Sequence, residues 1–302
     1  MTKPGPQQSN KSRLLHAHQH HPRHFKENLF VYPVLSRRSG GISIGINLSP
    51  HKGCNFDCLY CQVDRRPDQP KAPVYSTAQM ADELRDMIDQ VLSGHLFRLE
   101  PFDKTPASLQ RLNDIALSGD GEPTTEKEFL PTCRQVAQIK SDLNLEHVKI
   151  VLITNATLFH KSAVQEGLAL LDKHQGQIWA KLDAGSEAFY HFIDKTRIPF
   201  QRILDNITQA ARQRPVYIQT LFTRIDGQPV DPSEIEAYAD RINAISAEGG
   251  KITAIQLHTI ARPPADPRVS SLKDNELDAI AADIRSRLSL SVPIEIYYGR
   301  SE

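Results

Sequence analysis

Three cysteines lie within one short segment of the chain, "HKGCNFDCLYCQ" at residues 51–62. Cys54, Cys58 and Cys61 are separated by three and then two residues, and the chain has only one other cysteine, Cys133. Closely spaced thiols in a reducing compartment favour metal binding or redox chemistry over a disulfide framework. We therefore interpret the three cysteines as a set of metal ligands.

Two kinds of metal site are compatible with this spacing. Three thiolates on one loop can each bind one iron of a four-iron, four-sulfur cluster and leave the fourth iron to another ligand. Alternatively, His51 completes a Cys3His tetrahedron around zinc, although such sites usually take a second pair of ligands from elsewhere in the chain. The spacing favours the iron–sulfur cluster. Cys133 falls on a predicted helix, where a half-buried cysteine is ordinary.

A second segment, "LSGDGEPTT" at residues 117–125, directly follows a predicted strand. Its two glycines allow the backbone to approach a ligand closely, and exposed amides and carbonyls at a strand end can bind a zwitterion. Glycine-rich turns are common between a strand and a helix, so the segment alone is weakly informative. Glu122 has a second interpretation, as the cap of a helix that begins near Thr125.

Polar residues also occur at the ends of later predicted strands. Alternation places Lys181 and Asp183 on one face of their strand, and such buried groups must bind each other, water or a ligand. Both are candidate catalytic residues. A desolvated Lys181 amine could form a Schiff base with a carbonyl substrate, and the alternative is an internal ion pair with Asp183. The other strand-end residues are Thr154, Asn155, Gln219, Thr220, Gln256 and His258.

Short apolar segments alternate with longer amphipathic segments from Ile42 onward. The predicted strands are residues 42–48, 114–118, 149–154, 177–183, 216–222 and 253–258. The predicted helices are residues 77–93, 125–140, 161–174, 201–212, 232–246 and 274–288. This alternation predicts an α/β fold with parallel strands and outer helices, and residues 294–298 could add a seventh strand. Six units indicate an incomplete barrel or an open doubly wound sheet, both of which place function at the carboxyl ends of strands.

Several segments resemble a known family. They are "PVLSRRSGGISIGINLSPHKGCNFDCLYCQVDRR", "LSGDGEPT", "LITNATL", "KLDAGSEAFYHFIDK" and "IQLHTIARPPA". Together they resemble the wyosine-synthetase-like Fe-S oxidoreductases, a bacterial and archaeal group of the radical S-adenosylmethionine (SAM) superfamily whose members mostly lack an assigned substrate. The likeness extends over roughly residues 30–265. It implies a partial (β/α)6 barrel.

The resemblance also implies cofactors and roles. Cys54, Cys58 and Cys61 would hold a 4Fe-4S cluster whose free iron is chelated by SAM, and the reduced cluster would cleave SAM to a 5′-deoxyadenosyl radical. The remaining assignments are that Tyr60 borders the adenine, that Gly119, Asp120, Gly121, Glu122 and Pro123 orient the SAM amino group, and that Asn155, Asp183 and Gln219 contact its ribose or methionine part.

The characterised relatives of that group, the 4-demethylwyosine synthases, modify a guanine of transfer RNA with pyruvate and use a second cluster on extra N-terminal cysteines. Because this sequence has no cysteine before Cys54, that second cluster cannot form here. A tRNA-modifying enzyme of the same chemistry remains an alternative. A phosphate-binding surface for RNA could comprise Arg37, Arg38, Arg65, Arg66 and Arg262, or these could be solvated surface residues.

Composition sets the remaining expectations. The 36 basic and 36 acidic side chains balance, so net charge does not favour nucleic acid or an anionic membrane. No apolar segment is long enough to span a bilayer, and we expect a cytoplasmic protein that receives electrons from a donor such as flavodoxin or ferredoxin. We predict a disordered histidine-rich extension at residues 1–28 and a radical SAM domain at residues 29–302. The histidines of the extension, to which we assign no role, are His16, His18, His20, His21 and His24.

Overall fold

The computed structural model describes residues 25–65, 71–262 and 264–299. The histidines of the predicted extension lie outside the described residues, as does Arg66. Residues 25–28 are described, and they lie against the rest of the domain. The Phe25 ring meets the edge of the Phe102 ring at 6.4 Å between centroids, and the Asn28 side chain donates a hydrogen bond to the Val31 carbonyl.

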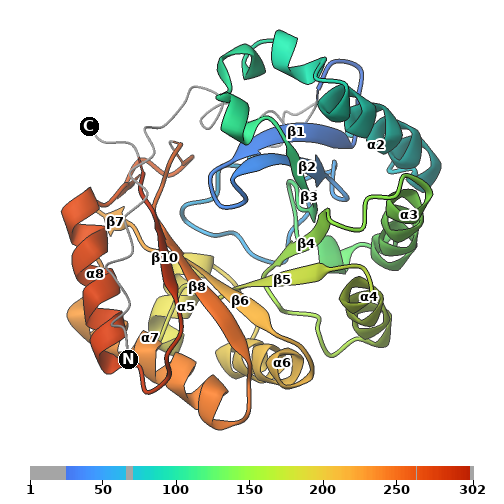
Figure 1. The fold of residues 1–302 in the computed structure, drawn as a ribbon. Coiled ribbons are helices and arrows are strands. Elements are labelled where there is room, and N and C mark those ends of the chain that lie inside the picture. Colours follow the sequence, from blue (N-terminus) through green and yellow to red (C-terminus); the bar gives the residue numbers. More distant parts are fainter. Residues whose placement is uncertain (1–24, 66–70, 263, 300–302) are drawn as a thin grey trace, which may run out of the picture.

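A single curved sheet of eight strands forms the centre of the molecule (Figure 1). Its order is β1-β2-β3-β4-β5-β6-β8-β10. All neighbouring pairs are parallel except β1 and β2, which are antiparallel. The strands are β1 Val31–Ser36, β2 Gly41–Ile46, β3 Leu112–Leu117, β4 Lys149–Thr154, β5 Gly176–Lys181, β6 Val216–Leu221, β8 Ile252–His258 and β10 Ile294–Tyr297.

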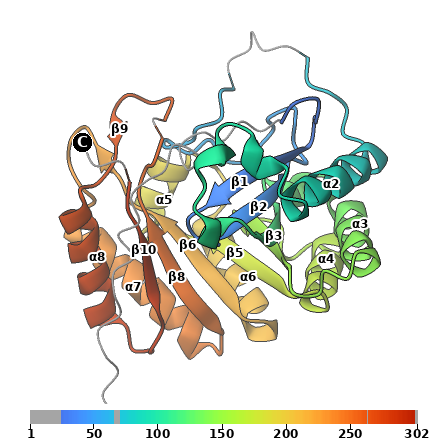
Figure 2. The same ribbon diagram turned by 45° about the horizontal axis from the view of Figure 1, so that its top comes forward.

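The two outermost strands, β1 and β10, do not pair with each other, so the sheet curls into an incomplete barrel. Six longer helices cover its convex side (Figures 1 and 2). They are α2 Thr77–Leu92, α3 Phe129–Asp142, α4 Ser162–Asp172, α6 Phe200–Gln213, α7 Pro232–Ala247 and α8 Asp274–Arg287. The prediction of an α/β fold with a partial barrel is therefore confirmed, including the added strand near the C-terminus.

The two faces of the sheet differ in chemistry. Its outer face packs against the helices in one large apolar core, whereas the inner face holds only a small apolar cluster around Ala116, Val151 and Trp179. Polar side chains such as Gln219 and Gln256 complete that inner face. Burial of apolar area between sheet and helices stabilises the fold, and the polar inner face is left to line the barrel.

Local sequence explains where several elements begin. Ser76 caps α2 by accepting a hydrogen bond from the Gln79 amide, and Asp231 caps α7 through the Ser233 amide with Pro232 in the first turn. These are favourable residues for a helix start.

The described residues include no helix that is both long and apolar enough to cross a membrane.

Some elements differ from the sequence prediction. Helix α3 begins at Phe129 and not at Thr125, because residues 123–125 form a separate 3-10 turn, η4. The prediction also missed β1, the short helix α5 Glu187–Asp194, and a two-stranded sheet of β7 Arg224–Ile225 and β9 Val269–Ser270. Strand β1 contains Pro33, which an edge strand tolerates because one of its sides needs no hydrogen bonds. Short 3-10 turns occur at η1 Leu96–Arg98, η2 Phe102–Lys104, η3 Ala107–Leu109 and η4 Pro123–Thr125.

Candidate functional site

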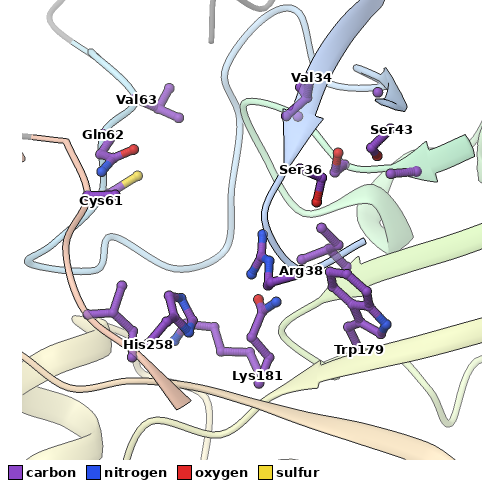
Figure 3. A pocket seen from close by; sticks show the side chains of 18 of the residues that line it. Val34, Ser36, Arg38, Ser43, Cys61, Gln62, Val63, Trp179, Lys181 and His258 are labelled. Atoms are coloured by element: carbon purple, nitrogen blue, oxygen red, sulfur yellow. The ribbon is translucent and has the colours of Figure 1, made fainter. Parts of the chain in front are cut away.

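One large cavity lies inside the curved sheet, with a volume of about 380 Å³. It collects residues that are far apart in the sequence, and Figure 3 shows Cys61 and Gln62 across it from Trp179, with Lys181 and His258 between them. The sequence-predicted residues that line it are Cys54, Cys58, Cys61, Tyr60, Gly119, Asp120, Gly121, Glu122, Asn155, Lys181 and Gln219. Pro123 and Asp183 are not among its lining residues. Pro123 lies in η4, and Asp183 is the second residue after the end of β5.

The cysteine loop follows β2 and is anchored from both sides. Its apolar residues Phe56 and Leu59 are buried, and the amides of Asp57 and Leu59 donate to the carbonyls of Asp194 and Ile193 at the end of α5. All four cysteines of the chain are free thiols. Burial raises the pKa of the Cys54 and Cys58 thiols. The loop therefore presents three unoxidised sulfur atoms to the cavity.

The hydrogen bonds of the His51 ring do not involve the three cysteines that were proposed to share a zinc ion with it. Its Nδ1 accepts a hydrogen bond from the Gly53 amide at 3.0 Å, and its Nε2 lies 3.2 Å from a carboxylate oxygen of Glu126. The ring is not among the cavity-lining residues. Both ring nitrogens are thus engaged away from the three thiols, which weakens the Cys3His alternative.

The glycines of the 117–125 segment are required by close packing against the cysteine loop. A Cβ atom on Gly121 would lie 1.8 Å from the Gly53 carbonyl oxygen, and one on Gly119 would lie 2.3 Å from Oδ1 of Asn47. The Asn47 side chain also accepts from the Asp120 amide and donates to the Asp120 carboxylate. The two motifs therefore form one joined wall of the cavity.

Glu122 is buried and its carboxylate is satisfied within the protein. It accepts hydrogen bonds from the Thr124 amide and hydroxyl, from the Thr154 hydroxyl at 2.6 Å and from the Asn155 amide at 2.7 Å. Burial raises the pKa of Glu122, and these donors oppose that rise. Glu122 thus ties the turn after β3 to the end of β4, and it also caps η4.

Arg65 links the two motifs from the side. Its guanidinium donates to the Lys52 carbonyl, to the sulfur of Cys61 at 3.0 Å and to the Asp120 carbonyl at 3.0 Å. The fork geometry of arginine allows these separate bonds from one side chain. Arg65 therefore connects the two motifs, and Arg37, Arg38 and Arg262 of the same predicted set also line the cavity.

Lys181 sits in a buried ionic cluster. Its ammonium contacts Asp183 at 2.8 Å and also pairs with Asp194, while the Tyr60 hydroxyl donates to Asp183. Burial alone would lower the pKa of Lys181, but the two carboxylates outweigh it and raise that pKa well above its ordinary value. The predicted pairing of Lys181 with Asp183 is present, and the structure adds Asp194 from α5, which the sequence did not suggest.

The remaining predicted ligand-binding residues hold defined contacts. Asn155 donates to the Asn55 side chain on the cysteine loop at 2.7 Å. Gln219 lies on β6 next to Gln256 of β8, with 3.5 Å between their amide groups. Burial, followed by the nearby Asp183, raises the pKa of Tyr60 well above its ordinary value, so its hydroxyl is a donor. These side chains reach the cavity from three different segments.

The sequence comparisons identify this arrangement. The model of the radical SAM superfamily matches residues 48–242. This range includes both the cysteine loop, residues 51–62, and the glycine turn, residues 117–125. The chain belongs to the radical SAM superfamily. Radical SAM membership makes the chain an enzyme and implies a 4Fe-4S cluster and SAM as cofactors.

Relatives of this radical SAM chain are distant. It is 22% identical to the GTPase Obg of Brachyspira hyodysenteriae over 87% of this chain. The match spans only 34% of the length of that protein. It is 24% identical to a UPF0026 protein of Helicobacter pylori over 83% of this chain and 73% of that protein. Among solved structures it resembles one of TYW1 with a lysine-pyruvate adduct bound, at a TM-score of 0.53 and 15% identity, over 82% of this chain and 74% of that chain. The structural likeness shows the same fold.

The residues present fit a radical SAM cluster by their donor chemistry. Three free thiols on one loop face one cavity, and the histidine that could complete a zinc site is engaged elsewhere. Within the described residues, no three histidine, cysteine or acidic side chains already stand together as a finished metal site.

Sequence reasoning missed Asn47, Asn55 and Asp194, and it named Arg65 only as part of a phosphate-binding surface. Asn47, Asn55 and Arg65 hold the motifs together, and Asp194 completes the ionic cluster. Arg65 follows Cys61 by four residues, so a search for donors next to the cysteine motif could have found it. Asp194 carries no local signal, because its pairing depends on the position of α5 relative to β5.

Proposed function

We propose that this enzyme cleaves SAM reductively to a 5′-deoxyadenosyl radical and directs that radical at a small substrate bound in the same cavity. The observation that supports it most is that the cysteine loop and the glycine turn form one wall of a single cavity. Cys54, Cys58 and Cys61 would hold the 4Fe-4S cluster, which supplies the electron for cleavage of the SAM sulfonium when both cofactors are bound.

The chain's own residues would bind and orient the reactants. Main-chain groups of the Gly119–Glu122 turn would bind the SAM amino group, since the Glu122 carboxylate is already satisfied. Tyr60 would border the adenine, and Asn155 and Gln219 would contact the ribose or methionine part. The walls of the barrel would shield the radical from water, which would otherwise quench it in side reactions. Lys181 lines the other wall of the cavity, and it remains a candidate catalytic residue together with Asp183, which pairs with it at 2.8 Å behind that wall.

Anaerobic reconstitution with iron and sulfide tests this function. Wild-type protein reduced with dithionite should form 5′-deoxyadenosine from SAM, as measured by mass spectrometry, whereas a Cys54→Ala, Cys58→Ala, Cys61→Ala triple variant should form none above background. Cys133→Ala is the matched control, because Cys133 is buried in α3 away from the cavity. Equal deoxyadenosine formation by the triple variant and wild type would refute the mechanism.

Lys181 is the candidate for covalent substrate binding. The TYW1 structure carries a lysine-pyruvate adduct, and Lys181 lines the cavity here. Its pairing with Asp183 and Asp194 keeps the amine protonated, so a Schiff base with a keto acid would require a proton transfer to one of these carboxylates first. Borohydride trapping with pyruvate tests this role. Absence of an adduct at Lys181 in peptide mass spectra would exclude it.

Two wider assignments accompany the proposal. Three free, clustered thiols suit a reducing compartment, so we place the enzyme in the cytoplasm with a flavodoxin or ferredoxin as electron donor. Modification of a tRNA base by the same chemistry is the second candidate function, supported only by the wyosine-synthetase-like fold. Filter binding of tRNA at two salt concentrations separates the two, because RNA binding through phosphates weakens steeply with salt. Lack of salt-sensitive binding would remove the RNA alternative.

A further inference from the structure

His258, the last residue of β8, lines the cavity but belongs to neither cofactor motif. It faces the same space as Lys181 (Figure 3). In the sheet it is in register with Leu221 of β6 on one side and with Tyr297 of β10 on the other. Residues in register on neighbouring strands project from the same face of a sheet. The His258 ring therefore stands between these two side chains, and both of them also line the cavity.

The hydrogen bonding of the His258 ring determines which of its nitrogens can bind a ligand. Nδ1 lies 3.5 Å from the main-chain carbonyl oxygen of Gln256. Because a carbonyl oxygen can only accept, Nδ1 carries the proton, and Nε2 of the neutral ring is then an acceptor. Within the described residues no donor reaches Nε2. Nε2 is also not sealed off from solvent, so its lone pair is open to the cavity.

The His258 ring is neutral at physiological pH, which keeps that lone pair available. Burial, followed by the Arg38 guanidinium, lowers the pKa of His258 to about 3. Asp183 opposes this change and Arg37 adds to it. These charged groups come from the β1–β2 turn and from the loop after β5, and Lys181 of β5 adds a further positive charge to the same cavity.

The donors on the neighbouring strands are engaged with other groups. The Lys181 ammonium pairs with two carboxylates of the ionic cluster, and the Tyr60 hydroxyl donates to one of them. On the other side, the Tyr297 hydroxyl donates to Glu295 at 2.9 Å. A polar atom in an enclosed site needs a hydrogen-bond partner, from the protein, from water or from a ligand. The described residues of the cavity wall therefore leave one acceptor for a ligand.

We propose that Nε2 of His258 accepts a hydrogen bond from a neutral donor group of the substrate, a hydroxyl or an amide N–H. This inference rests on the proposed function and defines its substrate class. The burial that disfavours a positive charge on the ring also disfavours a cationic amine beside it, so the donor is uncharged. A donor held at His258 fixes which carbon atom of the substrate faces the radical. His258 is thus a specificity-determining residue.

Diethyl pyrocarbonate tests the state of Nε2, because it acylates only an unprotonated imidazole nitrogen. The lone pair attacks a carbonyl carbon of the reagent, and ethyl carbonate leaves with the proton from Nδ1. The reconstituted, SAM-saturated full chain is treated anaerobically, and adducts are located by peptide mass spectrometry. Between about pH 5.5 and about pH 7.5 the rate at His258 should change less than about twofold, whereas added N-acetylhistidine, with an ordinary pKa near 6.5, should react about tenfold faster at the higher pH.

Protection of His258 by small probes identifies the donor group. The probes are glycerol, which carries hydroxyls, acetamide, which carries an amide N–H, and 1,2-dimethoxyethane, which has no donor. We expect glycerol or acetamide to cause a saturable loss of the adduct, and dimethoxyethane to leave it unchanged. The probe that protects at the lower concentration identifies the group that the site prefers. The adduct should form equally with and without SAM.

Two histidine variants assign the measured adduct. His258→Gln should remove it from its peptide, while N-acetylhistidine reacts as before. His147→Gln is the matched control, because His147 is exposed and does not line the cavity. This control should keep both the His258 adduct and its protection. The pH series and the protection series use the wild-type chain, so neither depends on the folding of a variant.

Four results would overturn the site: no adduct at His258, an adduct whose rate follows N-acetylhistidine with pH, no protection by either donor, or equal protection by dimethoxyethane. Protection by SAM alone would assign the acceptor to the cofactor and overturn the substrate role. Deoxyadenosine formation is assayed in parallel. Protection by a donor without deoxyadenosine would overturn the proposed function and keep the site, whereas deoxyadenosine without protection would overturn the site alone.

Discussion

The two walls of the cavity are stabilised in different ways. The wall of the cysteine loop and glycine turn is joined by backbone approach and by hydrogen bonds from Asn47 and Arg65. The wall around Lys181 is an ionic cluster whose members come from β5, its following loop and α5. The first wall needs small residues and close contact, whereas the second needs balanced buried charge. Substitutions in the first wall should therefore act through steric clash, and substitutions in the second through unpaired buried charge.

The largest effect is expected in the ionic wall. Lys181→Met would leave Asp183 and Asp194 buried together without their cation, and loss of one partner of a buried pair costs about 3–5 kcal/mol. Urea unfolding of wild type and variant under the same anaerobic conditions measures it. Arg134→Met, which breaks an exposed pair with Glu166, should cost less than about 1 kcal/mol. Equal losses in the two variants would mean that the Lys181 cluster is not a buried ionic unit.

The wall formed by the cysteine loop and the glycine turn should be destabilised most by a methyl group added at one of its glycines. Gly121→Ala would place Cβ 1.8 Å from the Gly53 oxygen, so the turn and the loop must separate, with a cost of about 1–3 kcal/mol as for other overpacked sites. Bound iron after reconstitution should fall as well. Gly94→Ala is the control: Gly94 has a positive φ of +77° but open space around its Cβ position, so it tests strain without a clash. Iron retention by Gly121→Ala at the wild-type level would contradict the packing argument.

A smaller effect is expected from the connector between the motifs. Arg65→Gln loses the N–H donor to the Cys61 sulfur, and such donors favour the reduced, more negative cluster. We expect a stability loss of about 1 kcal/mol and a more negative midpoint potential of the bound cluster. The potential is measured by redox titration with electron paramagnetic resonance. Arg65→Lys keeps the charge without the fork and should shift the potential less. An unchanged potential in Arg65→Gln would show that the bond to sulfur has no electronic role.

The smallest effect lies outside both walls. Ser76→Ala removes the cap of α2, which accepts from the Gln79 amide at 3.3 Å, and should cost about 1 kcal/mol or less in thermal unfolding. Iron content and deoxyadenosine formation should stay at wild-type levels. A loss of iron in Ser76→Ala would indicate that general destabilisation, and not a specific wall, explains the other variants.

The same contrast explains how much of the site could be predicted from sequence. The cysteine loop and the glycine turn are contiguous motifs, so their residues and their shared location at strand ends could be predicted without a structure. Asp194 and the contacts of Tyr60 with Asp183 depend on the docking of α5 and of a loop more than a hundred residues earlier in the chain. Pairings of this kind have no periodic or local signal.

The fold was predictable for a related reason. Parallel strands buried on both faces are continuous apolar segments, and all six predicted strands lie in the sheet. Strand β1 was missed because Pro33 interrupts its pattern, and its pairing with β2 depends on an edge position that sequence does not reveal. As a result, Arg37 and Arg38 were interpreted as surface residues, although the hairpin places them in the cavity.

The unpaired edges of the curved sheet also affect how molecules reach the interior. Arg37, just past β1, donates a hydrogen bond to the Tyr298 carbonyl, just past β10. This side-chain contact bridges the gap between the two edge strands, which in a closed barrel would be joined by backbone hydrogen bonds. Opening that gap requires the release of this contact and leaves the strand pairing intact. The two edges of the sheet are therefore joined here by a side-chain hydrogen bond and not by strand pairing.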